Sequence, residues 1–392
     1  MAAAFTSVPH LAIRQAIAIG THGHPDLPST VEWIESSHPY PDSRSESAGH
    51  RAMAVAQSVH SGEALVILLS GGASALMAAP MAGISLADKI ETTRVMMTSG
   101  ADIHALNTVR RHLSNVKGGR LAASCVGTTL TLAISDVVGD DLHAIGSGPG
   151  VSDVSTWSDV AAALERFGGA MHGERVMALV RDGVAGKVAD TPKPGHPSLA
   201  RATARVVGSR VDAMEGARKA AEERGYHAIV LPEPVTGEAR DAASKWLAAA
   251  LGAGTNCRAT VGASPPMSPP ASKPICVISS GETTVRVTGP GRGGRNLEFV
   301  LSIADALSSL PFGARPATVA SIGTDGIDGS SGVAGAIVDS TTIERARRAG
   351  LDAPARYLAA NDSLAFFAPL DDCVRLGRTD TNVGDLQVLL IE

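Results

Sequence analysis

Hydrophobic and polar positions alternate between two periods along most of the chain, starting near residue 44. Short apolar runs predict buried strands, and segments with a helical period predict helices. Strands are expected at 64–69, 128–135, 203–208 and 227–231, and helices at 45–61, 85–99, 102–117, 210–224 and 237–251. Strands that alternate with helices are typical of βαβ units. We therefore expect an α/β fold whose N-terminal domain is Rossmann-like, with a mainly parallel sheet.

Residues 252–273 interrupt this pattern with Gly, Ser, Ala and four prolines, and they contain almost no large apolar side chain. Such a composition is typical of a flexible linker or a surface insertion. After it, the pattern predicts strands at 275–279 and 284–288 and a helix from residue 295. We therefore predict two α/β domains, 1–251 and 274–392, on either side of this linker.

Composition narrows the classes of function. Aromatic residues make up 3% of the 392 residues, and the net charge is −5. Proteins that bind single-stranded nucleic acid stack bases on aromatic side chains, and polyanion binders carry a basic field, so neither class fits. No apolar run reaches 18 residues, and the four cysteines are widely spaced, so we expect a cytoplasmic protein with no membrane span and no nucleic-acid partner.

The first candidate site is the segment Ser70, Gly71, Gly72, Ala73 and Ser74, which directly follows the predicted strand 64–69. A glycine turn between a strand and a helix leaves backbone N–H groups free at the positive end of the helix, which suits a phosphate. No Gly-Lys-Ser/Thr follows, so the segment is not a Walker motif. An ordinary strand-to-helix turn explains these residues equally well.

The predicted helix 102–117 carries a polar stripe. At 100° per residue, Asn107, Arg110, Ser114 and Lys117 lie within about a quarter-turn of one another. Two cations and an amide therefore point in one direction, although most such stripes are simply solvated.

Aspartates follow the next predicted strand, at Asp136, Asp140 and Asp141. The carboxyl ends of strands in open α/β sheets are where ligands bind. Carboxylates there hold magnesium or orient a substrate hydroxyl, and the alternative is an Asx turn.

The C-terminal domain has a glycine-rich turn at 289–296 that carries Arg292 and Arg295 into a helix. An arginine at a helix start opposes the helix dipole unless an anion is present, so we expect an anion site there. Polar clusters at 324–329 and 381–385 also lie at element ends, and each could be only a turn.

Six segments of the chain together resemble the glycerate 2-kinase family with its MOFRL-type C-terminal domain. In chain order they are LLSGGASALM, GADIHALNTVRRHLSNVKGGRLA, SDVVGDDLHAIGSGP, GETTVRVTGPGRGGRNLE, GTDGIDGSSGVAGAIVD and TNVGDLQVLLI. The likeness runs from about residue 15 to the end of the chain, apart from 252–273.

The resemblance implies ATP-dependent phosphorylation of D-glycerate to 2-phosphoglycerate, with Mg²⁺, in a cleft between two α/β domains. It implies that Arg295 and Asp136 are catalytic and that the protein binds small molecules, with a homodimer as the expected assembly. The nucleotide contacts that it implies are Ser70, Gly71, Gly72, Ser74, Lys117, Gly293, Gly294 and Asn296. The glycerate contacts are Asn107, Arg110, Glu282, Asp325 and Asn382, and the magnesium ligands are Asp136 and Asp141.

The sequence also departs from the family pattern. Family members carry a Gly-Lys-Ala segment, with a lysine considered catalytic, and Met1 stands just after the corresponding position. We therefore expect the N-terminal domain to lack its first strand, and an impaired or inactive relative that binds nucleotide or glycerate is the alternative function. A hydroxypyruvate reductase is a third interpretation, but no G-x-G-x-x-G follows a strand within a βαβ unit.

Overall fold

A computed structural model describes residues 5–8, 10–21, 27–259, 273–309 and 316–392. The chain divides into two compact units. The N-terminal unit comprises residues 1–134 and 140–207, and the C-terminal unit comprises 135–139 and 208–392. Each unit is described by itself below.

The strands of the N-terminal unit form two small sheets. Strand β1 (Ala16–Gly20) pairs in parallel with β2 (Val31–Glu35). A second sheet has the order β3 (Ala64–Leu69), β4 (Thr128–Ile134), β5 (Ala202–Gly208), and its β3–β4 pair is parallel. The predicted α/β class with parallel strands in the N-terminal region is confirmed.

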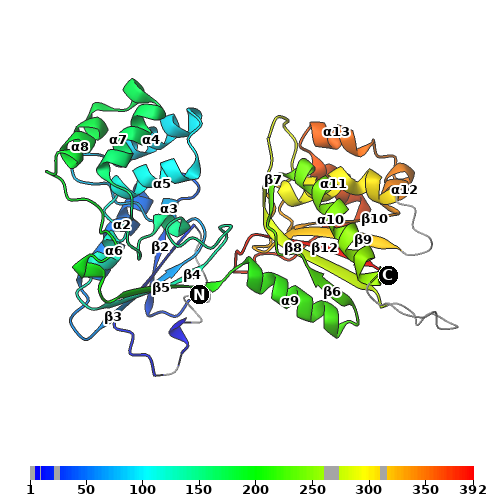
Figure 1. The fold of residues 1–392 in the computed structure, drawn as a ribbon, viewed down its shortest axis with the longest axis horizontal. Coiled ribbons are helices and arrows are strands. Elements are labelled where there is room, and N and C mark those ends of the chain that lie inside the picture. Colours follow the sequence, from blue (N-terminus) through cyan, green and yellow to red (C-terminus); the bar gives the residue numbers. More distant parts are fainter. Residues whose placement is uncertain (1–4, 9, 22–26, 260–272, 310–315) are drawn as a thin grey trace. The chain divides into compact units, whose positions relative to one another are not determined.

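Helices accompany these sheets in the N-terminal unit (Figure 1). They are α2 (Ser43–Gln57), α3 (Ala73–Leu76), α4 (Leu86–Thr98), α5 (Ile103–His112), α6 (Arg120–Ala123), α7 (Trp157–Arg166) and α8 (Glu174–Val184), with short 3-10 turns η1 (Ile145–Ser147), η2 (Gly169–Met171) and η3 (Pro197–Leu199). Helices α4, α5, α7 and α8 share one apolar core that includes Met96, Leu113 and Leu164. The predicted capping box of Ser85 and Asp88 is present at the start of α4.

The C-terminal unit is built on one seven-stranded sheet with the order β11-β10-β9-β12-β8-β6, in which β7 also pairs with β8. The strands are β6 (His227–Val230), β7 (Val235–Glu238), β8 (Ile275–Thr284), β9 (Ala317–Gly323), β10 (Gly335–Asp339), β11 (Cys373–Val374) and β12 (Asp385–Ile391). Strands β6 and β7 run parallel to β8, whereas the pairs from β8 through β12 to β11 are antiparallel.

Helices cover both faces of this sheet (Figure 1). They are α9 (Arg210–Glu223), α10 (Ala239–Ala259), α11 (Arg295–Ser308), α12 (Thr342–Arg348), α13 (Pro354–Ala359) and α14 (Ser363–Phe367), followed by the 3-10 turn η4 (Ala368–Leu370). Because side chains alternate along a strand, Ile275 and Val277 of β8 join the core with α10 and α11, and Cys276 and Ile278 join the core with α9.

The division between the units differs from the predicted boundary at 252–273. Residues 208–251 belong with the C-terminal unit because β6 and β7 pair with β8 in one sheet. The predicted strand 275–279 is the first half of a longer strand, β8, whose last four residues, 281–284, pair with β7. The second predicted strand, 284–288, is wrong, because β8 ends at Thr284 and residues 285–288 are not in a strand. Helix α10 extends to Ala259, where a linker was expected, and residues 260–272 lie outside the described part of the chain.

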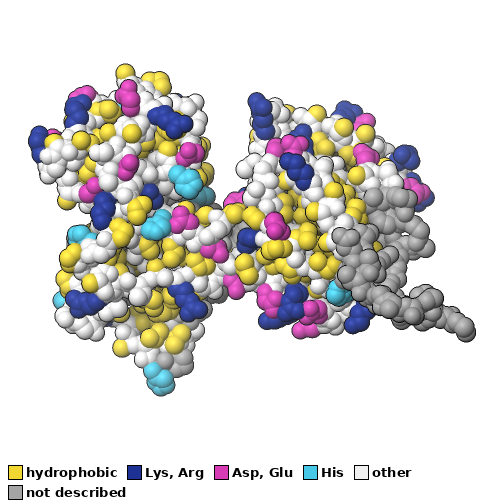
Figure 2. Space-filling model, viewed as in Figure 1, with side chains coloured by type: hydrophobic (Ala, Val, Ile, Leu, Met, Phe, Trp, Pro, Cys, Tyr) yellow, Lys and Arg dark blue, Asp and Glu magenta, His cyan; other side chains and the backbone are white. Residues whose placement is uncertain are grey.

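Two surface findings bear on function. On the face that Figure 2 shows, Lys and Arg side chains are interspersed with Asp and Glu, in keeping with the net charge of −5. Of the helices in the described ranges, none combines the length and the apolar character needed to cross a bilayer.

Candidate functional site

Three cationic side chains come together in the N-terminal unit. Lys89 projects from α4 and is 9% exposed, Lys117 follows α5 and is 2% exposed, and Arg110 lies near the end of α5. Burial lowers the pKa values of the two lysines, and the charge of Arg110 on both of them and of Lys89 on Lys117 adds to the effect, so the three groups are near enough to interact electrostatically. We call Lys89, Arg110 and Lys117 the cation cluster.

Lys117 anchors the glycine turn. Helix α5 ends at His112, not at Lys117 as predicted, and the chain then turns so that the Lys117 ammonium reaches back to α3. Its Nζ donates to the Ser74 carbonyl (2.7 Å), the Ser74 Oγ (3.0 Å) and the Met77 carbonyl (3.4 Å). These three bonds use the donor capacity of an ammonium, so Lys117 positions the turn and shapes the local charge.

A buried hydroxyl connects two further predicted residues. The Ser147 Oγ lies 3.1 Å from the Ser74 Oγ and donates to the Asn107 Oδ1 (3.1 Å). The structure thus brings Ser74, Asn107 and Lys117 into one network. Helix α3 has only four residues, so its dipole adds little, and attraction for an anion comes mainly from the cation cluster. Ser70 lies at the exposed start of the turn.

Burial weakens the protonated state of every member of the cation cluster. It lowers the pKa of Lys89 to about 7, with a further contribution from the charge of Arg110 and an opposing one from Glu46. Burial, with the charges of Lys89 and Arg110, holds the pKa of Lys117 well below its usual range, and burial also lowers the pKa of Arg110. An anion bound here would relieve all three shifts.

In the C-terminal unit, Arg295 begins α11 and is already paired with carboxylates. Its Nε and Nη2 donate to the two oxygens of Asp385 (2.7 and 3.0 Å), and its Nη1 donates to Glu282 (2.9 Å). Asp385 is fully buried, whereas the Glu282 side chain is 42% exposed. Burial acts to lower the pKa of Arg295, but the charge of Asp385 outweighs it and the pKa is raised. The anions that compensate this arginine at a helix start are therefore two side chains of the protein.

The glycines and Asn296 of this turn fit around a buried aspartate. Asp328 accepts from the backbone N–H groups of Asn296 (3.1 Å) and Leu297 (2.9 Å), so it caps α11 from a distant loop. A Cβ on Gly294 would lie 2.3 Å from the Asp328 carboxyl carbon, which explains the glycine. The Asn296 side chain donates to Asp385 (2.9 Å) and accepts from Ser321 (2.6 Å), so its polar atoms are used within the protein.

Asp136 and Asn382 meet in the same unit. The Asn382 Nδ2 donates to the Asp136 Oδ2 (3.1 Å). Burial raises the pKa of Glu282, and the charges of Asp136 and Asp385 add to that rise against the opposing effect of Arg295. Asp136, Glu282, Arg295 and Asn382 therefore form one polar constellation.

Two further predicted residues hold local turns. Asp325 accepts from the Ile327 N–H (3.0 Å) in a turn, and its charge helps to raise the pKa of the buried Asp385. Asp141 accepts from the His143 N–H (2.9 Å) in an Asx turn of the N-terminal unit, whereas Asp136 belongs to the C-terminal unit. Within the described ranges, no three His, Cys, Asp or Glu side chains come together to bind a metal.

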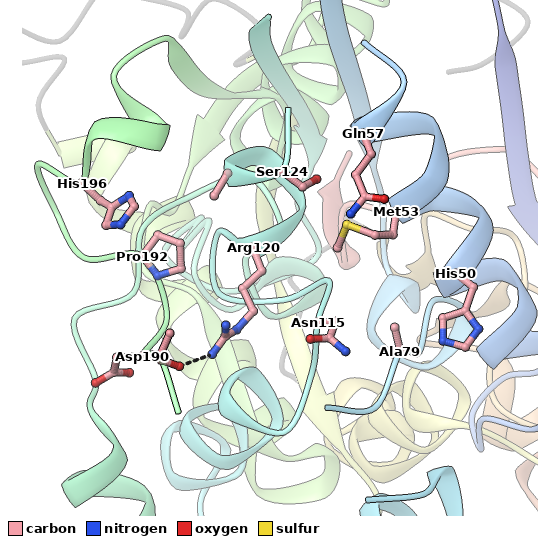
Figure 3. Close-up of a pocket in the computed structure, with 12 residues that line it drawn as sticks. His50, Met53, Gln57, Ala79, Asn115, Arg120, Ser124, Asp190, Pro192 and His196 are labelled. Carbon is pink, nitrogen blue, oxygen red and sulfur yellow. Dashed lines mark hydrogen bonds between the residues drawn. The ribbon is translucent and has the colours of Figure 1, made fainter. Parts of the chain in front are cut away.

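A separate pocket of about 530 Å³ opens in the N-terminal unit (Figure 3). Arg120 lies on its wall and donates to the Ala189 carbonyl (3.1 Å). His50, Asn115, Asp190 and His196 also line it, and none of its lining residues belongs to the cation cluster. The pocket is therefore distinct from the candidate site.

Sequence reasoning missed three residues. Leu86, Lys89, Thr92 and Val95 recur at every third position and share the buried face of α4, a signal that could have revealed Lys89. Asp328 and Asp385 lie in the clusters 324–329 and 381–385, but only the fold shows that both reach the start of α11.

Comparisons with known proteins cover both units. The domain of unknown function DUF4147 matches residues 1–181, and the MOFRL family matches 275–385. A Pyrococcus horikoshii protein named glycerate 2-kinase is 33% identical over 97% of this chain and 82% of its own length. A solved glycerate kinase from Thermotoga maritima is 34% identical, with a TM-score of 0.86 over 100% of this chain and 88% of that one. A relative from Agrobacterium vitis, 36% identical over 96% of this chain and 81% of its own length, is provisionally named a hydroxypyruvate reductase. The chain therefore belongs to the glycerate kinase family and carries its MOFRL domain.

Proposed function

We propose that this protein is a glycerate 2-kinase, which transfers the γ-phosphoryl group of ATP to the 2-hydroxyl of D-glycerate. The observation that carries the proposal is the similarity to proteins named glycerate 2-kinase over 97% of the chain, across both units. The alternative name among the relatives, hydroxypyruvate reductase, has no support from a dinucleotide-binding motif in the sequence.

The two polar constellations suit phosphoryl transfer, which depends on positive charge and positioning more than on a nucleophile of the enzyme. In the N-terminal unit, the cation cluster supplies positive charge. Among the described residues, no carboxylate forms a hydrogen bond or an ion pair with any of its three side chains. In the C-terminal unit, Arg295 keeps two bonds to Asp385, and its third, to the half-exposed Glu282, can be exchanged for a phosphate oxygen. Asp136 is the carboxylate that we propose accepts the proton of the attacking hydroxyl, oriented by Asn382.

Magnesium fits this proposal with one protein carboxylate. Mg²⁺ in kinases is held by one or two carboxylates together with the phosphates of the nucleotide, so a cage of three acidic side chains is not required. Asp136 is the residue that we propose would hold it, whereas Asp141 is engaged in its own turn. When bound, the ion would neutralise developing charge on the phosphates.

The state of the cysteines supports a cytoplasmic setting. Cys125, Cys276 and Cys373 are free thiols. Free thiols are typical of reducing compartments, where ATP is also available as the phosphate donor.

Turnover of D-glycerate tests the proposal. Purified protein with ATP, MgCl₂ and D-glycerate should give 2-phosphoglycerate, distinguished from the 3-isomer by ³¹P NMR. Arg110→Met should lower kcat/KM at least about tenfold, because it removes a charged contact, whereas the matched surface variant Arg175→Met should retain activity. The Arg175 side chain is 72% exposed.

Two other outcomes can be detected with the same preparation. Absence of product, with a Tm that rises when ATP or D-glycerate is added, would identify a binding protein that has lost catalysis. Oxidation of NADH with hydroxypyruvate, without phosphorylation, would favour a reductase. Either result would overturn the proposal.

A further inference from the structure

Lys89 is buried without a hydrogen-bond partner. Its side chain belongs to the inner face of α4 and is 9% exposed, and its Nζ makes no hydrogen bond to any described residue. An ammonium group in such a place destabilises the fold unless something compensates its charge. A buried lysine that no protein group satisfies is therefore a candidate for binding a ligand.

The charged groups around Lys89 do not provide that compensation. Helix α5 contributes Arg110, and Lys117 follows it, so two of the nearby charges are of the same sign as Lys89. Glu46 of α2 acts on Lys89 only through its charge. On α8, Arg175 lies 4.0 Å from Asp88, the residue before Lys89. The region thus holds an excess of positive charge.

Arg110 is less buried than Lys89, and it too lacks a partner within the described residues. It forms no hydrogen bond and no ion pair with another described residue, and burial lowers its pKa. Lys117 differs, because Ser74 and Met77 use its donors. Lys89 and Arg110 therefore have no partner among the described residues, whereas Lys117 holds the glycine turn in place.

We propose that Lys89 and Arg110 together bind an oxyanion, either a carboxylate or a phosphate, beside the turn that Lys117 anchors. This inference rests on the proposed function and deepens it, because the reaction brings both anions, the carboxylate of glycerate and the phosphates of ATP, to the protein. It assigns a binding role to Lys89, which lies outside the motifs that characterise the sequence.

Anion binding at Lys89 should take up a proton. With a pKa of about 7, Lys89 is roughly 90% neutral at pH 8 in the free protein. A bound anion favours the charged form and raises that pKa, so the lysine gains a proton from the buffer. The charge of Glu46 already favours protonated Lys89 in the free protein, and so it limits the number of protons taken up on binding. Glu46→Gln should therefore increase the proton uptake near pH 7.

Calorimetric titration at pH 8 tests the inference without turnover. D-Glycerate and ADP are titrated separately, in two buffers that differ in ionisation enthalpy. The ligand whose anion contacts Lys89 should bind with uptake of up to about one proton, which identifies the carboxylate or the phosphate as the source. Lys89→Met should abolish the uptake for that ligand and weaken its binding by about 10- to 100-fold.

Thermal stability separates a binding role from a structural one. Lys89→Met replaces an unsatisfied ammonium by an apolar chain of similar length, so without ligand its Tm should equal or exceed that of the wild type. Lys187→Met is the matched control: Lys187 is 70% exposed and pairs only with Asp182, so neither affinity nor proton uptake should change.

Two results would overturn the inference: a Lys89→Met variant that binds both ligands with wild-type affinity and proton uptake, or one that loses both together with a large fall in Tm. The test is independent of the proposed reaction. Proton-linked binding that requires Lys89, in a protein that does not phosphorylate glycerate, would refute the proposed function and leave this inference intact.

Discussion

At the scale of single residues, the two units hold buried cations in opposite ways. Arg295 is surrounded by carboxylates and keeps its charge firmly, because Asp385 outweighs the effect of burial on its pKa. Lys89 has no such partner, and burial brings its pKa to about 7. A compensated cation contributes to stability, whereas an uncompensated one favours ligand binding at the expense of stability.

Arg295→Ala should therefore lose stability as well as activity. The substitution leaves the Asp385 carboxylate, which is 0% exposed, without its two strongest donors, and breaking such a pair costs about 3–5 kcal/mol. Urea denaturation measures the loss. Arg292→Ala is the control, because the Arg292 side chain is exposed and, among the described residues, donates only to the Ser330 carbonyl, not to a carboxylate. An inactive Arg295→Ala protein with an unchanged free energy of unfolding would show that the arginine serves the ligand alone.

Asp328 should make stability depend on pH. Burial raises its folded-state pKa from 3.8 to about 6, so its protonated form is favoured in the folded protein. The stability that it contributes is complete below its unfolded pKa and is lost as the pH rises through about 6, by about 3 kcal/mol. Relative to Asp328→Asn, the wild-type free energy of unfolding should therefore fall between pH 4 and pH 7.

Urea denaturation of both proteins at the two pH values measures this difference. The exposed control Asp305→Asn should keep the wild-type dependence. A constant difference between wild type and Asp328→Asn across this range would contradict the prediction.

At the scale of elements, the start of α11 is organised by a residue far away in sequence. No side chain at the N-cap position, Gly294, satisfies the first N–H groups of the helix, and Asp328 does so from the loop after β9. The close approach of that carboxylate requires a residue without a Cβ at 294.

Gly294→Ala should therefore displace Asp328 and destabilise the helix start by at least about 2 kcal/mol, as overpacking of a close contact does. The backbone of Gly294 is extended, at φ −168°, so the effect comes from space and not from dihedral strain. Gly173→Ala is the control, because Gly173 has a negative φ and no atom lies within 4 Å of the position that its Cβ would take. Thermal melts of both variants measure the loss of stability. A Gly294→Ala variant with the same Tm as Gly173→Ala would refute the steric argument.

At the scale of the whole molecule, strand β8 fixes the extent of the C-terminal unit. It pairs with β6 and β7 from residues before it and with β12 from the end of the chain. Helices α9 and α10, which also precede it, contribute Met214 and Trp246 to the two cores of that unit.

A fragment of residues 208–392 should therefore fold, whereas one of residues 274–392 should not. The shorter fragment loses α9, α10, β6 and β7, and so exposes apolar side chains on both faces of the sheet. Circular dichroism melts should show a cooperative transition for the longer fragment only. Cooperative unfolding of 274–392 would instead support a boundary in the 252–273 segment.

The sequence by itself determined the α/β class, the bounds of β3 and α9 to within a residue, and the capping of α4, because these follow from local periodicity and local hydrogen bonds. It also indicated Ser74, Asn107, Lys117 and Arg295 as polar residues of interest. These features depend on neighbours that are close in the chain.

Only the tertiary structure decided what those residues contact. Lys117 was expected on a helix face, but the helix ends at His112 and its ammonium holds the Ser74 turn. Arg295 was expected to face a ligand anion, and it faces Asp385, 90 residues further along the chain. Lys89 became a candidate only when burial left it without a partner. Long-range contacts and desolvation set these outcomes, and neither can be derived from spacing along the chain.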